Sequence, residues 1–257
     1  MCLINLHYGE HPTYKLVVAA NRDESYDRPT AQADFWEENP DLLAGRDLVH
    51  NGTWLGITKS GRFAALTNYR DPAEFGIEKK SRGDIVKDFL MANIDPVEFL
   101  EIARKNKDEY AGFNLIVGNA DGLYYFSNKQ AEIKEIPMGT HSLSNEYLNT
   151  PWPKVTKGKA RLQDYVRQHE VMETDALFDI LHDTEMASDE LLPDTGVGVD
   201  LERKLSSLFI KTPNYGTRCS TVVLVGHDDS ITFVERTFSK GIAVDEVRFV
   251  ITHRMVK

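Results

Sequence analysis

Cys2 is the residue whose position in this sequence most directly suggests chemistry. Removal of Met1 by methionine aminopeptidase, which a small second residue permits, would place a thiol and a free α-amine on the same residue. The reference pKa of an α-amine is about 7.7–8.0 and that of a thiol about 8.5, so some neutral amine is available near pH 7 to accept the thiol proton. The sequence therefore allows a cysteine nucleophile that carries its own base and has a lowered thiol pKa. The alternative is a small buried apolar residue in a first strand.

A second polar group, Asn21–Glu24, directly follows the apolar run Leu16–Ala20. We expect a strand to end at Ala20. A hairpin with the first strand would bring Cys2 beside this group. The functional interpretation is a carboxylate and a guanidinium at the mouth of a site. The alternative is a solvated turn with a local ion pair, which contributes little to stability.

The elements that must position these residues begin with a sheet. Turn sequences at 51–52 and 59–61 separate apolar stretches that alternate with polar residues, as in antiparallel strands. The predicted strands are Leu3–Tyr8, Tyr14–Ala20, Leu42–Arg46, Thr53–Thr58 and Phe63–Tyr69. Two helices should follow, one over Arg82–Met91 with Ser81 as its cap. The other begins at Asp95, where an acidic N-cap precedes Pro96 and a capping-box Glu98.

The second half repeats the order of strands, helices and strands. Strands are predicted at Asn114–Gly118, Leu123–Asn128, Glu132–Ile136 and His141–Ser144, with a turn at 119–122. Helices are predicted at Lys154–Arg167, Thr174–Leu181 and Leu201–Leu208, and strands at Val222–Val225, Thr232–Thr237 and Val247–Ile251. Because strands and helices do not alternate regularly, this order indicates an α+β layered architecture rather than a parallel doubly wound sheet.

The composition excludes several classes of protein. Lys and Arg number 30 against 40 Asp and Glu, a formal net charge of −10, and the densest basic stretches are short and interrupted. No nucleic-acid partner is expected, since such a surface needs clustered Lys and Arg. No phosphate-binding loop, dinucleotide fingerprint or HExxH segment occurs, and the eight histidines lie far apart. We therefore expect neither a metal nor a cofactor.

The cysteines and the lengths of the apolar runs indicate the cellular compartment in which we expect the protein. Cys2 and Cys219 have no CxxC partner, which is typical of a reducing compartment. The N-terminus lacks the basic and apolar segments of a signal peptide, and the apolar runs are far shorter than the ~20 residues that span a bilayer. A cytoplasmic protein without a membrane span is expected. No pattern indicates an oligomeric state.

Together with Cys2, a series of short motifs resembles the NRDE family, also called the transport and Golgi organisation 2 family. The matching segments occur in order along nearly the whole chain: Asn21–Glu24, Asn51–Gly56, Ala65–Arg70, Ser81–Gly83, Gly112–Leu115, Leu143–Asn145, Thr150–Lys154 and Tyr215–Arg218. Asn51 stands where the family usually has Gly, and Cys219 where Ser is commoner. The resemblance implies one domain over residues 1–257 with a fold similar to N-terminal nucleophile hydrolases, an αββα sandwich of two antiparallel sheets between helical layers.

The resemblance also implies roles for particular residues. Cys2 resembles the nucleophile of the cysteine members of that hydrolase superfamily, whose α-amine Asp23 would orient. Asn145, with Asn68, would stabilise the oxyanion, and Arg22 or Arg218 would position substrate or polarise the site. Asn21 belongs to the same group of substrate-binding candidates. Trp54, Tyr69 and Trp152 would supply an apolar wall, although both tryptophans could instead be core residues and Asn68 a strand-end hydrogen-bonding residue.

Two functions follow from these residues and from the resemblance. The first is an amidohydrolase that cleaves a small or amphipathic amide or acyl compound with Cys2 as nucleophile. The second keeps the fold without the reaction and binds or carries haem or another hydrophobic ligand, since members of the family have been linked to haem trafficking. No histidine or cysteine spacing identifies a haem site, because axial ligation can use a single residue anywhere in the chain.

Overall fold

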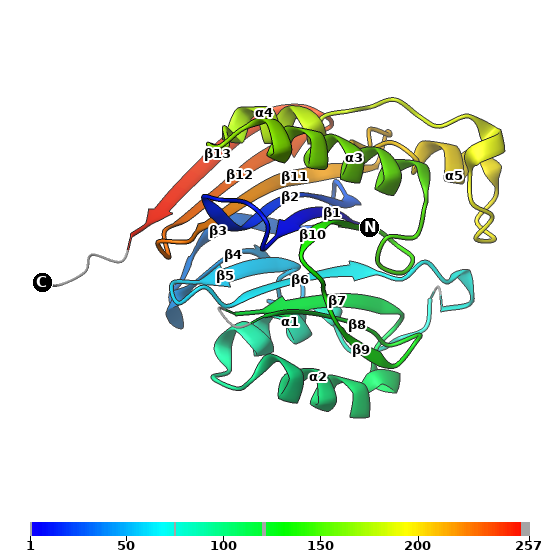
Figure 1. Cartoon of the computed structure of the whole chain (residues 1–257). Coiled ribbons are helices and arrows are strands. Elements are labelled where there is room, and N and C mark those ends of the chain that lie inside the picture. Colours follow the sequence, from blue (N-terminus) through cyan, green and yellow to red (C-terminus); the bar gives the residue numbers. More distant parts are fainter. Residues whose placement is uncertain (1, 75, 120–121, 253–257) are drawn as a thin grey trace, which may run out of the picture.

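The structure is a computed structural model that describes residues 2–74, 76–119 and 122–252. Met1, whose removal is predicted, and the middle of the predicted turn at 119–122 lie outside the described residues. Two antiparallel sheets face each other, and each is covered on its outer side by helices (Figure 1). The α+β prediction and the αββα sandwich that the resemblance implied are both confirmed.

The first sheet has six strands in the order β10-β1-β2-β11-β12-β13. Its central strand pair joins the N-terminal hairpin to a strand almost two hundred residues later. The strands are β1 (Cys2–Tyr8), β2 (Tyr14–Ser25), β10 (Gly139–Leu143), β11 (Tyr215–Gly226), β12 (Ile231–Ser239) and β13 (Ile242–Ile251).

The second sheet has seven strands that follow one another in chain order from β3 to β9. All neighbouring strands in it are antiparallel, so it is a continuous meander interrupted by two helices between β6 and β7. The strands are β3 (Thr30–Trp36), β4 (Asn39–Asp47), β5 (Leu55–Thr58), β6 (Phe63–Asn68), β7 (Phe113–Gly118), β8 (Leu123–Ser127) and β9 (Glu132–Glu135).

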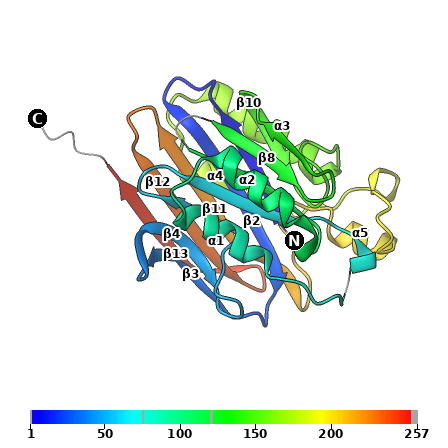
Figure 2. The ribbon, with the colours of Figure 1, turned by 90° about the horizontal axis from the view of Figure 1, so that it is seen from below.

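Each helical layer belongs to one sheet. The helices α1 (Arg82–Met91) and α2 (Pro96–Lys105) cover the second sheet, as the view from below shows (Figure 2). The helices α3 (Pro153–Gln168) and α4 (Thr174–Leu181) cover the first, and α5 (Val199–Lys204) follows them. Short 3-10 turns occupy Pro72–Glu74, Lys107–Glu109 and Asp189–Leu191.

Strand periodicity separates two environments along β1. Cys2, Ile4 and Leu6 point between the sheets, where they join the larger apolar core. Leu3 points the other way and packs with Val155 of α3. This alternation follows from the two-residue period of a strand, and it decides which neighbours each residue near the N-terminus meets.

Several sequence-based boundaries are wrong, and one strand was missed. β11 begins at Tyr215 rather than Val222, and β13 at Ile242 rather than Val247. The second strand does not end at Ala20 but continues to Ser25, because Asn21–Asp23 pair with β11 inside the sheet. The last helix ends at Lys204 rather than Leu208, since the hydroxyls of Ser206 and Ser207 donate to backbone carbonyls and so compete with helical hydrogen bonds. β3 was not predicted at all.

Within the described ranges no helix is long and apolar enough to cross a membrane. The cytoplasmic location stays a prediction.

Candidate active site

Three neighbouring strands bring two cysteines to either side of one arginine. Arg22 of β2 pairs with Cys2 of β1 on one side and with Cys219 of β11 on the other. Asp23, the next residue of β2, lies on the opposite, helix-covered face, and a β-bulge at Arg218 shifts the register so that Thr217 pairs with it on that face. Bulges often occur beside active sites because they redirect side chains in this way.

A cavity of about 280 Å³ opens beside Cys2. Its walls come from β1, β2, the loop before β5, the end of β6 and the segment leading into α1. Five Lys or Arg and three Asp or Glu contribute to the lining, which gives it an excess of positive charge. The lining residues are Cys2, Arg22, Asp23, Glu24, Arg28, Asp47, His50, Thr53, Trp54, Leu66, Asn68, Ile77, Lys79, Lys80, Ser81, Arg82, Gly83 and Ala111.

The Cys2 thiol is buried, with 8 % of the residue exposed. Burial raises its pKa, and the nearby Asp23 charge acts in the same direction. The Arg22 guanidinium and a backbone hydrogen bond from Asp23 lower the pKa but do not prevail. In this environment removal from water outweighs the neighbouring cation; the expectation of a lowered thiol pKa concerns the processed chain, in which Cys2 carries the α-amine, and stays a prediction.

Arg22 is held in place from the cavity side. Its guanidinium donates to the Thr30 hydroxyl at 3.2 Å and lies 3.6 Å from the Asp47 carboxylate. Asp47 also accepts a 2.5 Å hydrogen bond from Arg28, and these contacts to Arg28 keep the Asp47 pKa low against the effect of burial. The three charged residues form one fixed wall of the cavity.

Asp23 is 1 % exposed and has its carboxylate on the helix-covered face. One carboxylate oxygen accepts a 2.8 Å hydrogen bond from Thr217, and the Tyr215 hydroxyl donates to the Asp23 backbone carbonyl. Burial raises the Asp23 pKa, and the largest opposing influence is the charge of Lys154. A buried carboxylate is thus fixed next to the residue that begins β1.

The wall opposite Cys2 depends on a close backbone contact between two loops. A Cβ atom at Gly52 would lie 2.5 Å from the backbone carbonyl carbon of Gly83, and Thr53 N–H donates to the Gly83 carbonyl at 3.2 Å. Asn51 precedes this contact with φ 58°, a left-handed conformation that Asn tolerates better than most residues. The contact places Arg82, the first residue of α1, at the cavity.

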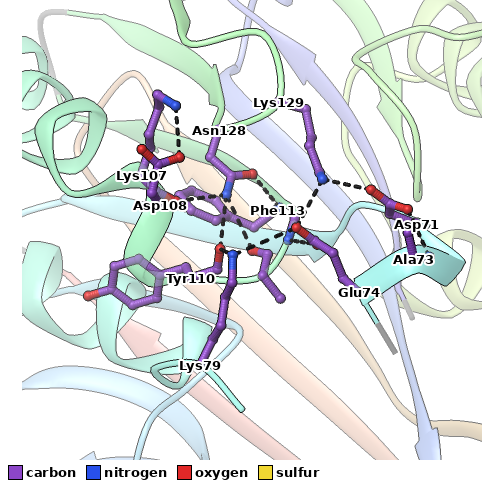
Figure 3. A network of polar contacts seen from close by, with 12 residues as sticks. Asp71, Ala73, Glu74, Lys79, Lys107, Asp108, Tyr110, Phe113, Asn128 and Lys129 are labelled. Atoms are coloured by element: carbon purple, nitrogen blue, oxygen red, sulfur yellow. Dashed lines mark hydrogen bonds and ion pairs between the residues drawn. The ribbon is translucent and has the colours of Figure 1, made fainter. Parts of the chain in front are cut away.

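A polar network fixes the segments that carry the outer rim (Figure 3). Glu74 accepts from Gly112 N–H at 2.5 Å and from Lys129 at 3.0 Å. Lys79, which lines the cavity, donates to the Tyr110 carbonyl at 3.2 Å. Half-buried hydrogen bonds therefore hold the segment before α1 against the loop before β7 and against the turn between β8 and β9.

The two predicted oxyanion residues contact each other. The Asn145 amide donates to the Asn68 backbone carbonyl at 2.8 Å, and its own oxygen accepts from Ser144. Asn68 lines the cavity, whereas Asn145 lies behind it and is fully buried. This geometry makes Asn145 a support for the end of β6, with Asn68 as the residue nearer to a bound carbonyl.

Four other predicted residues lie away from this cavity. Asn21 donates to the carbonyls of Leu181 and Leu208 on the helix-covered face. Arg218 donates to the Ser25 and Arg28 carbonyls, Tyr69 donates to Glu146, and Trp152 packs with Leu3 and Val155. Each has a structural partner, so the roles predicted for them find no support in the geometry.

Sequence reasoning missed Arg82 and Lys154 as individual residues, although both belong to the motifs Ser81–Gly83 and Thr150–Lys154. Arg82 donates to the Gly112 carbonyl at 3.1 Å and makes no ion pair within the described ranges. Lys154 is 2 % exposed, and its ammonium has no hydrogen-bond partner among the residues that the structure describes. Basic residues at the starts of two helices give no sequence signal, because such residues usually point to solvent.

The geometry also bears on metal binding and on disulfide formation. No group of three or more His, Cys, Asp or Glu side chains in the described part of the chain is arranged to hold a metal ion. Cys2 and Cys219 are both free and lie on strands separated by β2. Two strand spacings amount to about 9.5 Å, beyond the roughly 7 Å between Cα atoms that a disulfide allows.

Sequence comparison finds relatives over almost the whole chain. The sequence model of the family described as Transport and Golgi organisation 2 matches residues 1–240. The human Transport and Golgi organization protein 2 homolog is 35 % identical, over 92 % of this chain and 93 % of the relative. The Drosophila melanogaster Transport and Golgi organization protein 2 is 27 % identical, over 93 % of each chain.

Structural comparison finds a similar fold in a distant protein. The C2A mutant of the conjugated bile acid hydrolase from Clostridium perfringens matches with a TM-score of 0.54, over 99 % of this chain and 97 % of that chain. The sequence identity is 9 %. At this level the similarity concerns the fold alone.

Proposed function

We propose that this chain, which belongs to the transport and Golgi organisation 2 family, is a cysteine N-terminal nucleophile amidohydrolase. Its substrate would be a small or amphipathic amide or acyl compound. One observation carries the proposal: the first residue of β1 is a cysteine that lines a charged cavity, beside Arg22 and next to the buried carboxylate of Asp23.

The reaction begins with removal of Met1, which frees the α-amine of Cys2. The amine takes the thiol proton while the sulfur forms a bond to the substrate carbonyl carbon. The C–N bond then breaks, the leaving nitrogen receives the proton from the ammonium, and a thioester remains on Cys2. Water attacks this thioester with the amine again as base, which releases the acid and restores the thiol.

The surrounding residues divide the remaining tasks. Asp23 orients the amine, and Asn68, held by Asn145, donates to the developing oxyanion. Arg22 stabilises negative charge close to the sulfur. Arg82 faces the same space without an ion-pair partner in the described part of the chain, so an anionic group of the substrate would bind there.

The conjugated bile acid hydrolase with the similar fold supports the choice of an amide or acyl bond only as an analogy. Its C2A mutation replaces a cysteine that has the same number, 2, as Cys2 in this chain. Function resides in sites rather than folds, so the proposal depends on Cys2 and its cavity and not on the shared architecture.

Two measurements test the proposal. Intact mass should first show that Met1 is absent from the native protein. The processed protein, Cys2→Ser and Cys2→Ala are then incubated with N-acyl amino acids of short, medium and long chain and with their neutral amide counterparts, and released amine is measured. We expect hydrolysis by the wild type, weak hydrolysis by Cys2→Ser and none by Cys2→Ala. A retained Met1, or equal hydrolysis by Cys2→Ala, would refute the proposal.

A second candidate function, binding of haem or another hydrophobic ligand, is favoured by a different cavity. It has a volume of about 520 Å³ at the opposite end of β1, and its lining includes Tyr8, Leu16, Phe63, Leu123, Val225 and Ile231. Apolar walls of this kind suit a hydrophobic ligand. Haem titration followed in the Soret region tests the idea: Leu16→Trp should abolish a stoichiometric spectral change and Cys2→Ala should not. Absence of a saturable change in the wild type would exclude haem.

A further inference from the structure

The first turn of α3 lies over the end of β1 that Cys2 begins. Val155 packs with Leu3, and one turn later Gly158 lies so close to Asn5 that an added Cβ would be 2.5 Å from the Asn5 side-chain oxygen. The step from Val155 to Gly158 advances about 4.5 Å along the helix, and the step from Leu3 to Asn5 about 6.6 Å along the strand, so α3 runs along β1 in the same direction. Lys154 is therefore level with the start of β1.

Helix geometry directs the Lys154 side chain towards that start. Side chains on a helix lean towards its N-terminus, which here means towards Cys2 and beyond. The residue is 2 % exposed, so its long stem and ammonium stay inside the protein. Among the described residues the ammonium has no hydrogen-bond partner. An unpartnered buried cation thus points at the place where a free N-terminal amine would lie.

Three effects disfavour a charged ammonium at Lys154. Burial removes the ammonium from water, no described residue replaces its hydrogen bonds to water, and the positive end of the α3 dipole is nearby. Consistent with these costs, burial lowers the Lys154 pKa to about 8. Since a neutral side chain of similar length would avoid all three, retention of the lysine calls for a role other than stability.

The charged groups around Lys154 come from every element packed near it. Asp23 of β2 and Cys2 of β1 favour its charged form, Arg70 disfavours it and Glu202 of α5 favours it. Arg70 and Glu202 form their own buried ion pair, and Arg70 also lies over the Trp152 ring. With that pair neutral overall, Lys154 is the side-chain cation with the largest influence on Asp23. Arg22, whose guanidinium lies beside Asp47, has a smaller one.

We propose that Lys154 is a positioning residue that keeps the α-amine of processed Cys2 neutral. Without another cation, the buried Asp23 carboxylate would hold the amine as its ammonium counterion, and an ammonium cannot accept the thiol proton. Lys154 supplies the positive charge that Asp23 requires and repels a second one on the amine. The inference rests on the proposed N-terminal nucleophile, although it does not depend on any particular substrate.

The test measures the pH dependence of Cys2 alkylation in chains that begin at Cys2, prepared by proteolytic cleavage of a fusion directly before this residue. Iodoacetamide is the probe, and peptide mass separates Cys2 from Cys219. In Lys154→Met the amine and the thiol should both lose their protons at higher pH, and the alkylation rate near pH 7 should fall roughly tenfold, equivalent to about one pKa unit. Lys154→Arg keeps the charge and should stay within about threefold of the wild type.

Lys157→Met is the matched control, because Lys157 lies on the same helix but pairs with Asp183 and Glu185. It should leave the alkylation profile unchanged. Lys154→Met should melt at the same temperature as the wild type or higher, since it removes a buried unpartnered charge. An unchanged profile in Lys154→Met, an equal shift in Lys154→Arg, or failure of Lys154→Met to fold would each overturn the inference.

Failure of the inference and failure of the proposed function remain distinguishable. Retention of Met1 in native protein, or amide hydrolysis that survives Cys2→Ala, removes the function but leaves the alkylation profile of the cleaved chain to judge Lys154. Conversely, hydrolysis that depends on Cys2 with a profile insensitive to Lys154 keeps the function and refutes the role of the lysine.

Discussion

Two cysteines flank Arg22, one on each neighbouring strand, and each has a buried carboxylate nearby: Asp23 on β2 for Cys2 and Glu235 on β12 for Cys219. Cys2 lies next to Asp23, and Cys219 lies next to Glu235, whose charge raises the pKa of the Cys219 thiol beyond the effect of burial. All four residues are buried. Residue types and the shared arginine are therefore nearly the same in the two regions.

The two regions differ in whether a cavity reaches the thiol and in which group offsets the burial of the carboxylate. Both cysteines belong to the apolar core between the sheets, but of the two only Cys2 also lines the charged cavity among the described residues. Asp23 is offset mainly by the charge of Lys154, whereas the largest influence offsetting burial of Glu235 is a hydrogen bond from Ala33 N–H at 2.8 Å. A thiol beside an acid and an arginine is thus insufficient for chemistry, which also requires space for a carbonyl and a base that can change its charge.

The largest expected difference between the two regions is in catalysis. Cys2→Ala should lower amide hydrolysis roughly a thousandfold or more, because the nucleophile is lost, and Cys219→Ala should change it less than about twofold. Released amine from the N-acyl amino acid panel measures both. A large loss in Cys219→Ala with an intact fold would contradict the assignment of the reactive region.

Support of the oxyanion site should have the next largest effect. Asn145→Ala removes the hydrogen bond that holds the Asn68 backbone, so it should displace the Asn68 donor; complete loss of one oxyanion donor typically lowers kcat by about 10²–10³-fold, which sets the upper bound of the effect. The fold should survive, with a loss on the order of 1 kcal/mol for one buried hydrogen bond. Steady-state kinetics and thermal unfolding check the two effects. An unfolded variant would reassign Asn145 to structural support alone.

A smaller effect is expected from Arg82, the cavity residue that we expect to bind an anionic group of the substrate. Arg82→Met should lower kcat/KM for N-acyl amino acids about 10–100-fold, as expected for one charge-assisted hydrogen bond, and should spare their neutral amides. Arg104→Met removes an equal charge from an exposed pair with Glu101 on α2 and serves as the control. Equal losses for anionic and neutral amides would show that Arg82 does not bind the anionic group.

The local parts of the fold were predictable from the sequence. The bounds of α1 and α4 coincide with their predictions, and Asp95 caps α2 by accepting from Val97 and Glu98 N–H groups. Turn residues and strand alternation gave most strands to within a few residues. β3 was missed because it is an edge strand whose register shifts twice and whose apolar residues are interrupted by exposed Gln32 and Asp34.

Long-range pairing explains what the sequence alone did not reveal. Asn21 and Asp23 read as a polar strand end, but Ser220 and Thr217 of β11, almost two hundred residues away, donate to their side chains within the sheet. Lys154 was expected only as a helical residue, because its burial arises from the placement of α3 over β1. The sequence identified Cys2 and its neighbours on β2 as site residues. The charged cavity could be recognised only in the folded structure, because its walls come from segments far apart in the chain.

Alkylation should separate the two thiols even without a substrate. Burial raises the pKa of both, so iodoacetamide must reach each thiol and capture its thiolate. Cys2 faces the cavity and, once Met1 is removed, carries a neighbouring amine, so it should react at least about tenfold faster than Cys219 at neutral pH. Peptide mass after timed labelling measures the ratio, and unfolding in denaturant should abolish it. Equal rates in the folded protein would refute the nucleophile assignment.

The smallest effect is expected from Glu235, the buried carboxylate near Cys219. Burial raises the pKa of Glu235 above its ordinary value near 4.5, so the folded protein binds its proton more tightly than the unfolded chain does. The contribution of Glu235 to stability is therefore complete below its unfolded pKa and is lost as pH rises through its folded pKa, at about 1.4 kcal/mol for each unit of difference. Glu235→Gln keeps an acceptor for Ala33 N–H and removes the titration.

The free energy of unfolding of Glu235→Gln should thus decline less than that of the wild type between about pH 5 and pH 8, with the largest gain of the variant at the alkaline end. Urea unfolding at a series of pH values measures the difference between the two proteins, in which the titrations of Asp23 and Cys2 cancel because they are common to both. Amide hydrolysis should be unaffected, since Glu235 does not line the Cys2 cavity in the described part of the chain. A variant that is equally destabilised at every pH would mean that Glu235 is held as a carboxylate across the range. The two carboxylates beside Arg22 would then be alike in charge, and only access to the cavity would separate their cysteines.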